Sequence, residues 1–394
     1  MAGSQVVVLD ALNMYRHPSH FSIPQAITAV LKLAMRPDPP VVALFVDMTH
    51  RIEYRTTEAQ LQKLIEALRT FRATLPATVP ENWWAEIWDA DANEKSKRIV
   101  ILGASSVNGI GAAIAAQCLA RGAHNILLVG RRSDALREVK IALIAQQDTP
   151  EQRERAEQLQ LFVADCTDEE DVLRIADSVT QNFGGIDTVY IVFGIMCGQP
   201  LLALADMDPM AGATRTQPTL NSLRSVSEVA QQCSNANMTG TALVLAALIP
   251  CLQTTSKSPY VALIGSLAAL IPAPTRSLYC ATKAAQQMLV QSVASECRAQ
   301  AEKKGRALVQ FVTVAPSTVS TSFSTRLVIG GRDRRAHPPS NAMSAEHVGK
   351  LAVQCVDTNR TGIVPIPFSY FFVWLLSPII SPWIERGARR RYDY

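Results

Sequence analysis

The amino-acid sequence predicts an α/β fold in which a doubly wound parallel sheet is covered by helices on both faces. From residue 97 to about residue 325, short apolar runs alternate with longer segments of helical periodicity. The apolar runs are continuous, as in strands that are buried on both faces. The first run leads through a glycine-rich turn into an Ala-rich helix. The chain has 394 residues, enough for one large domain or two ordinary ones.

Residues 1–96 predict an extra N-terminal α/β segment. Apolar runs at 5–12 and 39–48 predict strands, and each is followed by a segment with helical spacing, at 23–35 and 57–71. The acidic and polar passage 81–98 then predicts a linker. We therefore expect an accessory segment at 1–96, a catalytic domain at 97–361 and an apolar tail at 362–394.

The strands of the second region are predicted in chain order from its apolar runs. Each run is short and is followed by a turn or by a helical segment. The predicted strands are Arg98–Leu102, Asn125–Val129, Leu159–Ala164, Thr188–Val192, Tyr260–Ile264 and Leu308–Val314.

The tail is apolar, aromatic and basic at its end. It contains four prolines, Pro365, Pro367, Pro378 and Pro382. A helix that spans a bilayer needs about 20 apolar residues without such breaks. A segment in the membrane interface fits better, with Trp374 and Trp383 at headgroup level and Arg389–Arg391 near anionic lipid. The alternative is a tail that docks on the protein core.

The glycine-rich turn GASSVNGIG raises the question of nucleotide binding. Glycines let the backbone approach a pyrophosphate, and the following helix N-terminus supplies N–H donors. Gly103 and Gly109 are two residues further apart than in a common nucleotide-binding turn, so the turn alone also fits an ordinary tight turn. The candidate phosphate contacts are Gly103, Ser105, Ser106, Gly109, Ile110 and Gly111.

A set of polar residues later in the sequence favours a nucleotide-binding turn over an ordinary tight turn. Tyr279 and Lys283 are four apart on a predicted helix, Ser266 follows the strand VALIG, and Asn237 enters a helix. Each alone is commonplace, because a Tyr and a Lys at this spacing usually lie on a solvated helix face. Together, in this order, they resemble the short-chain dehydrogenase/reductase family over about residues 97–325. The resemblance implies a Rossmann-like fold and carbonyl–alcohol interconversion.

The resemblance also implies the roles of these residues. Tyr279 would donate the proton, and Lys283 would lower its pKa and hold the nicotinamide ribose. Ser266 would bind the substrate oxygen, and Asn237 would support a water relay to Lys283. The further cofactor residues that it implies are Asp165, Cys166, Gly194, Pro316, Val319 and Thr321. The long glycine turn resembles that of the divergent enoyl reductases.

The passage LLVGRR predicts the choice of cofactor. An acidic residue after the second strand would bind the ribose hydroxyl of NAD. Gly130 stands there instead, and Arg131 and Arg132 follow. A guanidinium matches a phosphate, so NADPH is favoured over NADH. The alternative is two exposed arginines at a helix start.

Two features depart from the family pattern. The fourth strand ends in IVFG rather than Asn-Asn-Ala-Gly, and Ser317 replaces the glycine after Pro316. These departures leave a non-catalytic nucleotide-binding or scaffold protein as the alternative. The tail resembles the membrane-associated 11β-hydroxysteroid-dehydrogenase-like branch and suggests a lipophilic substrate such as a steroid or a sphingoid.

Residues Asp10, Asn13 and Asp47 follow strand runs and resemble the start of a PIN/NYN-like nuclease, which holds a divalent metal with carboxylates. Turn and capping roles fit them better. His17 and His20 have no further ligands nearby, so no metal site is predicted.

The net charge and the cysteine content indicate which partners and which cellular compartment fit this protein. The net charge of +4 is too small to indicate nucleic-acid binding. The eight cysteines form no CxxC pair, which favours free thiols in a reducing compartment. We expect association with a membrane surface, at the endoplasmic reticulum or a lipid droplet, with a soluble cytoplasmic protein as the alternative. A homodimer is left open.

Overall fold

The computed structural model describes residues 97–321, 342–392 and 394. The predicted N-terminal strands and helices, the candidate nuclease residues Asp10, Asn13 and Asp47, and the two histidines lie outside the described residues.

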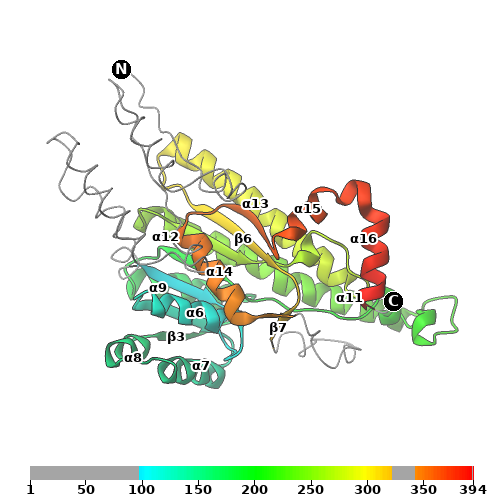
Figure 1. Cartoon of the computed structure of the whole chain (residues 1–394), viewed down its shortest axis with the longest axis horizontal. Coiled ribbons are helices and arrows are strands. Elements are labelled where there is room, and N and C mark those ends of the chain that lie inside the picture. The colour runs from blue at the N-terminus through cyan, green and yellow to red at the C-terminus, as the bar shows by residue number, and fades with distance from the viewer. Residues whose placement is uncertain (1–96, 322–341, 393) are drawn as a thin grey trace, which may run out of the picture. The chain divides into compact units, whose positions relative to one another are not determined.

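The described chain alternates strands and helices (Figure 1). The strands are β1 Arg98–Leu102, β2 Asn125–Gly130, β3 Gln160–Val163, β4 Thr188–Ile191, β5 Tyr260–Ile264, β6 Gln310–Pro316, β7 Val319–Ser320, β8 Met343–Ser344 and β9 Gly362–Ile366. The α-helices are α6 Ile110–Ala120, α7 Ser133–Ala145, α8 Pro150–Glu157, α9 Glu169–Gln181, α10 Leu201–Leu204, α11 Leu220–Ser234, α12 Gly240–Thr255, α13 Ser277–Lys304, α14 Ala345–Asp357, α15 Ser369–Leu375 and α16 Ser377–Tyr392. The shorter turns are η1 Pro209–Ala211, η2 Asn235–Thr239 and η3 Leu267–Ala269.

Seven of these strands form one parallel sheet in the order β3-β2-β1-β4-β5-β6-β9. The order reverses beside β1, which creates the crevice in which doubly wound sheets bind ligands. The predicted α/β fold with a doubly wound parallel sheet is confirmed. Each of the six predicted strands is present, with ends that differ by at most two residues.

The sheet lies between two hydrophobic cores because successive strand residues face opposite sides. In β1, Ile99 and Ile101 face the core formed with α6, α7 and α14. Val100 and Leu102 face the core formed with α9, α12 and α13. Figure 1 shows α6 and α14 together on one side of the sheet.

The seventh strand was not predicted, because β9 belongs to the passage that the sequence analysis placed in the tail. It pairs with β6 from Gly362 to Ile366 and lies at the edge of the sheet. An edge strand tolerates Pro365, since the backbone N–H that proline lacks is not needed there by a further strand. The remainder of the tail forms the two helices α15 and α16.

Among the described residues, one helical stretch is long and apolar enough to cross a membrane, at Leu220–Thr255. It comprises α11, η2 and α12, and α12 packs in the core against the sheet. By itself this is weak evidence for a membrane span.

Candidate active site

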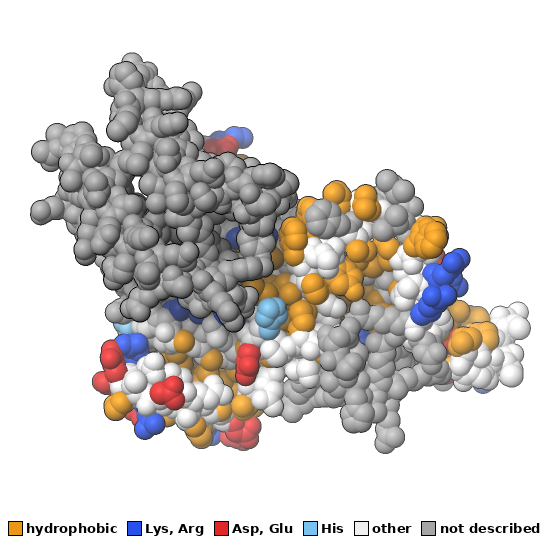
Figure 2. All heavy atoms as spheres, viewed as in Figure 1, with side chains coloured by type: hydrophobic (Ala, Val, Ile, Leu, Met, Phe, Trp, Pro, Cys, Tyr) orange, Lys and Arg blue, Asp and Glu red, His pale blue; other side chains and the backbone are white. Residues whose placement is uncertain are grey.

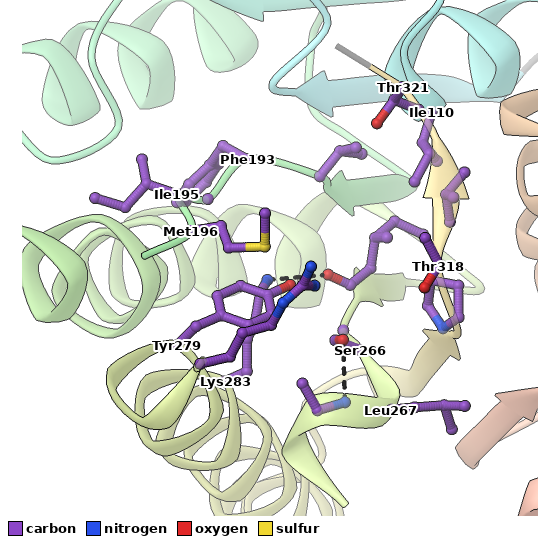
Figure 3. A pocket seen from close by; sticks show the side chains of 18 of the residues that line it. Ile110, Phe193, Ile195, Met196, Ser266, Leu267, Tyr279, Lys283, Thr318 and Thr321 are labelled. Carbon is purple, nitrogen blue, oxygen red and sulfur yellow. Dashed lines mark hydrogen bonds between the residues drawn. The ribbon is translucent and has the colours of Figure 1, made fainter. Parts of the chain in front are cut away.

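A cavity of about 880 Å³ opens at the carboxyl ends of the parallel strands. Of the residues predicted for the site, sixteen line it: Gly103, Ser105, Ser106, Gly109, Ile110, Arg131, Arg132, Asp165, Cys166, Gly194, Ser266, Tyr279, Lys283, Pro316, Val319 and Thr321. Gly111 and Asn237 do not line it. Figure 3 shows Tyr279 and Lys283 entering from α13, with Ser266 opposite them.

The glycine-rich turn is folded tightly between β1 and α6. Gly103 has φ +99°, which favours glycine, and a Cβ there would lie 2.6 Å from the Phe193 backbone nitrogen. Gly111 is not exposed to the cavity because it packs on the turn, where a Cβ would lie 2.8 Å from the Gly103 carbonyl oxygen. The helix N-cap, Gly109, provides no side-chain cap. The start of α6 therefore resembles an anion-binding cradle, with Ser105 and Ser106 at the cavity wall.

Two arginines lie at the end of the cavity next to β2 and β3. Arg131 Nη1 donates to Asp165 Oδ2 at 3.3 Å, and Arg132 Nη2 donates to the Ser105 carbonyl at 2.6 Å. Burial acts to raise the Asp165 pKa, but hydrogen bonds from Thr167 and the Arg131 charge outweigh it and lower this pKa. Asp165 is therefore ionised at neutral pH and holds Arg131 beside the cavity.

Gly130, which precedes the two arginines, packs closely against Ser105. A Cβ at Gly130 would lie 2.9 Å from the Ser105 Cβ. The position that holds an acid in NAD-binding sites is thus sterically closed to any side chain in this arrangement.

Tyr279 and Ser266 lie together at the opposite end of the cavity. Tyr279 is in the first turn of α13 and is 6% exposed. Burial raises the Tyr279 pKa to about 12, while a hydrogen bond with Ser266 and the charge of Arg276 act to lower it. Ser266 Oγ also accepts the Ala268 N–H at 3.1 Å, which fixes the hydroxyl (Figure 3). The Tyr279 hydroxyl is therefore protonated throughout the neutral range and can donate its proton.

Lys283 lies one helical turn after Tyr279 and is 4% exposed. Its Nζ donates to Gln286 Oε1 at 2.8 Å and is 3.4 Å from the Ile264 carbonyl. Burial lowers the Lys283 pKa to about 8. The sequence analysis expected Lys283 to lower the Tyr279 pKa. In the structure the Ser266 hydrogen bond and the Arg276 charge act to lower the Tyr279 pKa, and the effect expected of Lys283 stays a prediction.

Asn237 lies outside the cavity, in the π-helical turn η2. Its Oδ1 accepts the Ile195 N–H at 2.9 Å, and its Nδ2 donates to the Ile195 carbonyl and to Thr282 Oγ1, both at 3.0 Å. Both amide hydrogens are thus engaged. These bonds hold the segment after β4 against α13, and the water relay from Asn237 to Lys283 stays a prediction.

Known proteins resemble this chain in sequence and in fold. The sequence model of the short chain dehydrogenase family matches residues 97–329. The chain belongs to this family. An uncharacterized oxidoreductase of Staphylococcus epidermidis is 30% identical over 277 residues, which cover 70% of this chain and all of the relative. The protein is thus an oxidoreductase of the short chain dehydrogenase type.

Two solved structures show the same fold as this dehydrogenase. A short chain dehydrogenase from Burkholderia cenocepacia, solved in complex with NADP, is 16% identical and has a TM-score of 0.53. The comparison covers 75% of this chain and 98% of that one. One from Streptomyces avermitilis is 19% identical, with a TM-score of 0.54 and coverage of 74% and 98%.

The passage IVFG of this dehydrogenase keeps its glycine for a steric reason. A Cβ at Gly194 would lie 2.7 Å from Asn237 Oδ1 and 3.3 Å from Lys283 Nζ. Phe193, which stands in place of a polar residue, donates its N–H to the Leu102 carbonyl at 3.1 Å and lines the cavity. The backbone course next to the cavity is thus fixed without the family's asparagines.

Sequence reasoning missed one wall of the cavity. The helices α15 and α16 supply Tyr370, Val373, Trp383, Ile384, Gly387, Ala388 and Tyr392. It also missed Arg276, which lines the cavity just before α13. The spacing of Arg276, three residues before Tyr279, was the available signal.

Proposed function

We propose that this protein is an NADP(H)-dependent oxidoreductase that interconverts a carbonyl and an alcohol on a lipophilic substrate at a membrane surface. The observation that carries the proposal is the gathering of Ser266, Tyr279 and Lys283 in one cavity with the glycine-rich turn and the arginine pair. These groups come from four parts of the chain, and a cavity shared by all of them is what such a reaction needs.

The residues of the cavity fit a dinucleotide. The glycine-rich turn and the first residue of α6 line the cavity, and Lys283 and Tyr279 reach the same cavity from α13. When bound, the reduced nicotinamide supplies a hydride. The turn and the α6 N-terminus would hold its pyrophosphate, and Lys283 would hold its ribose.

Residues of the chain itself would carry out the proton transfer. Ser266 would bind the substrate oxygen and orient it toward Tyr279. The Tyr279 hydroxyl would protonate that oxygen as negative charge develops on it. Arg276 and the Ser266 hydrogen bond favour the phenolate that results, since both lower the Tyr279 pKa.

The preference for NADP(H) rests on Arg131 and Arg132. Both line the cavity beside Gly130, where no acidic side chain is present to bind a ribose hydroxyl. A guanidinium in this place matches a phosphate. The arginines therefore support NADPH over NADH.

The lipophilic substrate and the membrane surface rest on the tail. Phe368, Leu375, Leu376 and Trp383 are 46%, 59%, 44% and 74% exposed, respectively. Figure 2 shows apolar side chains over α15 and α16 with basic side chains beside them. Such a surface suits the interface of an anionic bilayer, and the tail resembles that of the 11β-hydroxysteroid-dehydrogenase-like enzymes.

The test is a nucleotide titration followed by a substrate screen. NADPH and NADH are titrated by calorimetry, and oxidation of NADPH is then followed with long-chain ketones, steroids and simple carbonyls. We expect tighter binding of NADPH and turnover of apolar ketones. Nucleotide binding without turnover of any carbonyl would instead favour the non-catalytic alternative.

A further inference from the structure

A chain of buried side chains connects Lys283 to the protein interior. Lys283 Nζ donates to Gln286 Oε1 at 2.8 Å, and Gln286 Nε2 donates in turn to Thr241 Oγ1 at 2.7 Å. The Thr241 hydroxyl donates to the Asn237 carbonyl at 2.8 Å. Gln286, Thr241 and Asn237 are fully buried. The chain therefore runs from the cavity wall to the backbone of η2 without reaching solvent.

The chemistry of these groups gives the chain one direction. A protonated amine can only donate, so the Gln286 side chain turns its oxygen toward Lys283 and its amide nitrogen toward Thr241. Thr241 accepts from that amide and uses its single hydrogen for the Asn237 carbonyl. The Gln286 side chain is thus fixed in one orientation, with an acceptor aimed at Lys283.

Asn237 ties this network to α13 at a second point. Its Nδ2 donates to Thr282 Oγ1 at 3.0 Å, on the residue just before Lys283. Asn237 belongs to the π-helical turn η2, and such turns occur frequently at functional sites. The place of the Lys283 ammonium is therefore set by contacts with η2 and α12 as well as by α13 itself.

We propose that Gln286 is a positioning residue for Lys283, which it holds at the cavity wall where the nicotinamide ribose would bind. This inference rests on the proposed function, in which Lys283 holds that ribose. The ammonium of a lysine sits on a long, flexible stem, so a fixed acceptor restricts it to one place. Gln286 itself does not line the cavity and would act through Lys283.

The Gln286 acceptor also has an electrostatic effect on Lys283. Burial lowers the Lys283 pKa to about 8. A hydrogen bond accepted from the ammonium favours the charged form and opposes this effect of burial. Without Gln286 Oε1, the Lys283 pKa should fall further, and less of the ammonium would remain at neutral pH to hold the ribose.

The next residue of α13 provides a matched control. Gln287 is 8% exposed, and its Oε1 has no hydrogen-bond partner among the described residues. Gln286→Met and Gln287→Met make the same change to two buried glutamines of one helix, but only the first removes the acceptor of Lys283. Gln286→Glu keeps an oxygen acceptor on a side chain of the same length.

The first experiment compares two ligands by calorimetry at pH 7. NADPH carries the nicotinamide ribose, whereas adenosine 2′,5′-bisphosphate carries only the adenosine half of the cofactor. We expect Gln286→Met to bind NADPH roughly 3- to 10-fold more weakly than the wild type and to bind the bisphosphate equally well. Gln286→Glu and Gln287→Met should keep the wild-type affinity for NADPH. In a Lys283→Met background, Gln286→Met should have no further effect.

Several binding results would overturn the proposal. An unchanged affinity of Gln286→Met for NADPH would do so, as would an equal weakening of both ligands, which indicates a general structural defect. A loss of the same size in Gln287→Met or in Gln286→Glu would show that the acceptor is not the cause. A loss that persists in full in the Lys283→Met background would show that Gln286 does not act through Lys283.

The second experiment needs no nucleotide. The free energy of unfolding in urea is measured between pH 7 and pH 9. Because the Lys283 pKa is lower in the folded than in the unfolded protein, stability rises with pH between the two values. Gln286→Met should steepen this rise, Gln286→Glu should flatten it, and Gln287→Met should leave it at the wild-type value.

The other titratable side chains around Lys283 are the same in all of these variants, so their contributions cancel in the comparison. Those that line the cavity or lie on the adjoining segments are Arg131, Arg132, Asp165, Cys166, Cys197, Arg276, Tyr279, Cys280, Tyr370 and Tyr392.

The two experiments separate the role of Gln286 from the proposed function. A wild type that binds no NADPH would contradict the proposed function, and the unfolding slopes would still decide the role of Gln286. Equal slopes for the wild type and Gln286→Met would overturn that role. If Gln286→Met does not fold, the slope of Gln286→Glu decides, and a value equal to that of the wild type would overturn the role as well.

Discussion

Replacing Lys283 with methionine tests the electrostatics of the buried centre without any substrate. Lys283 is 4% exposed, and its charge is held in the interior by the Gln286 side chain and the Ile264 carbonyl. Lys283→Met removes the charge and keeps an unbranched side chain of similar length. We expect the variant to fold and to change the pH dependence of stability.

The magnitude follows from the Lys283 pKa, which lies at about 8 in the folded protein against an ordinary 10.5. Because the folded value is the lower one, the unfolded chain binds more protons between these pH values, and stability rises with pH there. The difference costs the folded protein about 3 kcal/mol at pH 7. Roughly 1 kcal/mol of this is regained by pH 9.

The substitution also leaves Gln286 Oε1 without its donor, at 2.8 Å in the wild type. Leaving a buried acceptor unpaired costs about 1–3 kcal/mol. That cost does not depend on pH over this range. It therefore changes the absolute stability of Lys283→Met but not the slope of its unfolding free energy against pH. The difference in slope between the variant and the wild type then reflects the charge of Lys283 alone.

Urea denaturation followed by circular dichroism, between pH 7 and pH 9 and without nucleotide, measures the slope. The upper limit avoids ionisation of tyrosine: the raised Tyr279 pKa contributes stability that is lost only as pH rises above its ordinary value of 10. Between pH 7 and pH 9, the free energy of unfolding of the wild type should rise by about 1 kcal/mol more than that of Lys283→Met. The control is Lys304→Met, in the exposed last turn of α13, which should keep the wild-type slope. Parallel slopes for Lys283→Met and wild type would refute the reasoning.

The other predictions concern turnover, cofactor choice and the tail. Tyr279→Phe should lower turnover about 10²–10⁴-fold with NADPH binding preserved in calorimetry, and near-normal turnover would remove Tyr279 from the mechanism. Replacing Arg131 and Arg132 with alanine should weaken NADPH binding by about 1.5–3 kcal/mol and NADH binding by less, whereas equal losses would show that they do not read the phosphate. Truncation after Pro367 keeps β9 and removes α15 and α16. It should lower kcat/KM and abolish co-sedimentation with anionic liposomes, and a full-length chain that ignores such liposomes would contradict the membrane surface.

Most of the sheet could be predicted because its strands are continuous apolar runs, each buried on both faces. The edge strand β9 could not, since Pro365 and the adjoining aromatic residues gave its sequence the character of the tail. An edge position removes the hydrogen bond that proline cannot make, but a strand's place in a sheet is not visible in its own sequence.

Local motifs gave the candidate site its main residues, because the glycine-rich turn and the Tyr279–Lys283 pair are short segments whose geometry follows from one turn or one helix. Contacts between distant segments were not accessible in this way. The bond from Asn237 to Ile195 and the stacking of Arg276 on Tyr392 join residues far apart in sequence. They depend on how η2 packs on the segment after β4 and how α16 packs beside the start of α13, which no spacing encodes.

The cavity wall formed by α15 and α16 lies after the segment that matches the sequence model of the family. The family match ends at residue 329, and α15 begins at Ser369. The glycine-rich turn, Ser266, Tyr279 and Lys283 all lie within that match. On the proposed function, the residues that would bind the nucleotide and transfer the proton lie within the matched segment, whereas part of the wall that would face the substrate lies after it. Chimeras that exchange the segment after β9 between related dehydrogenases should shift substrate preference toward that of the donor and keep the cofactor preference of the recipient.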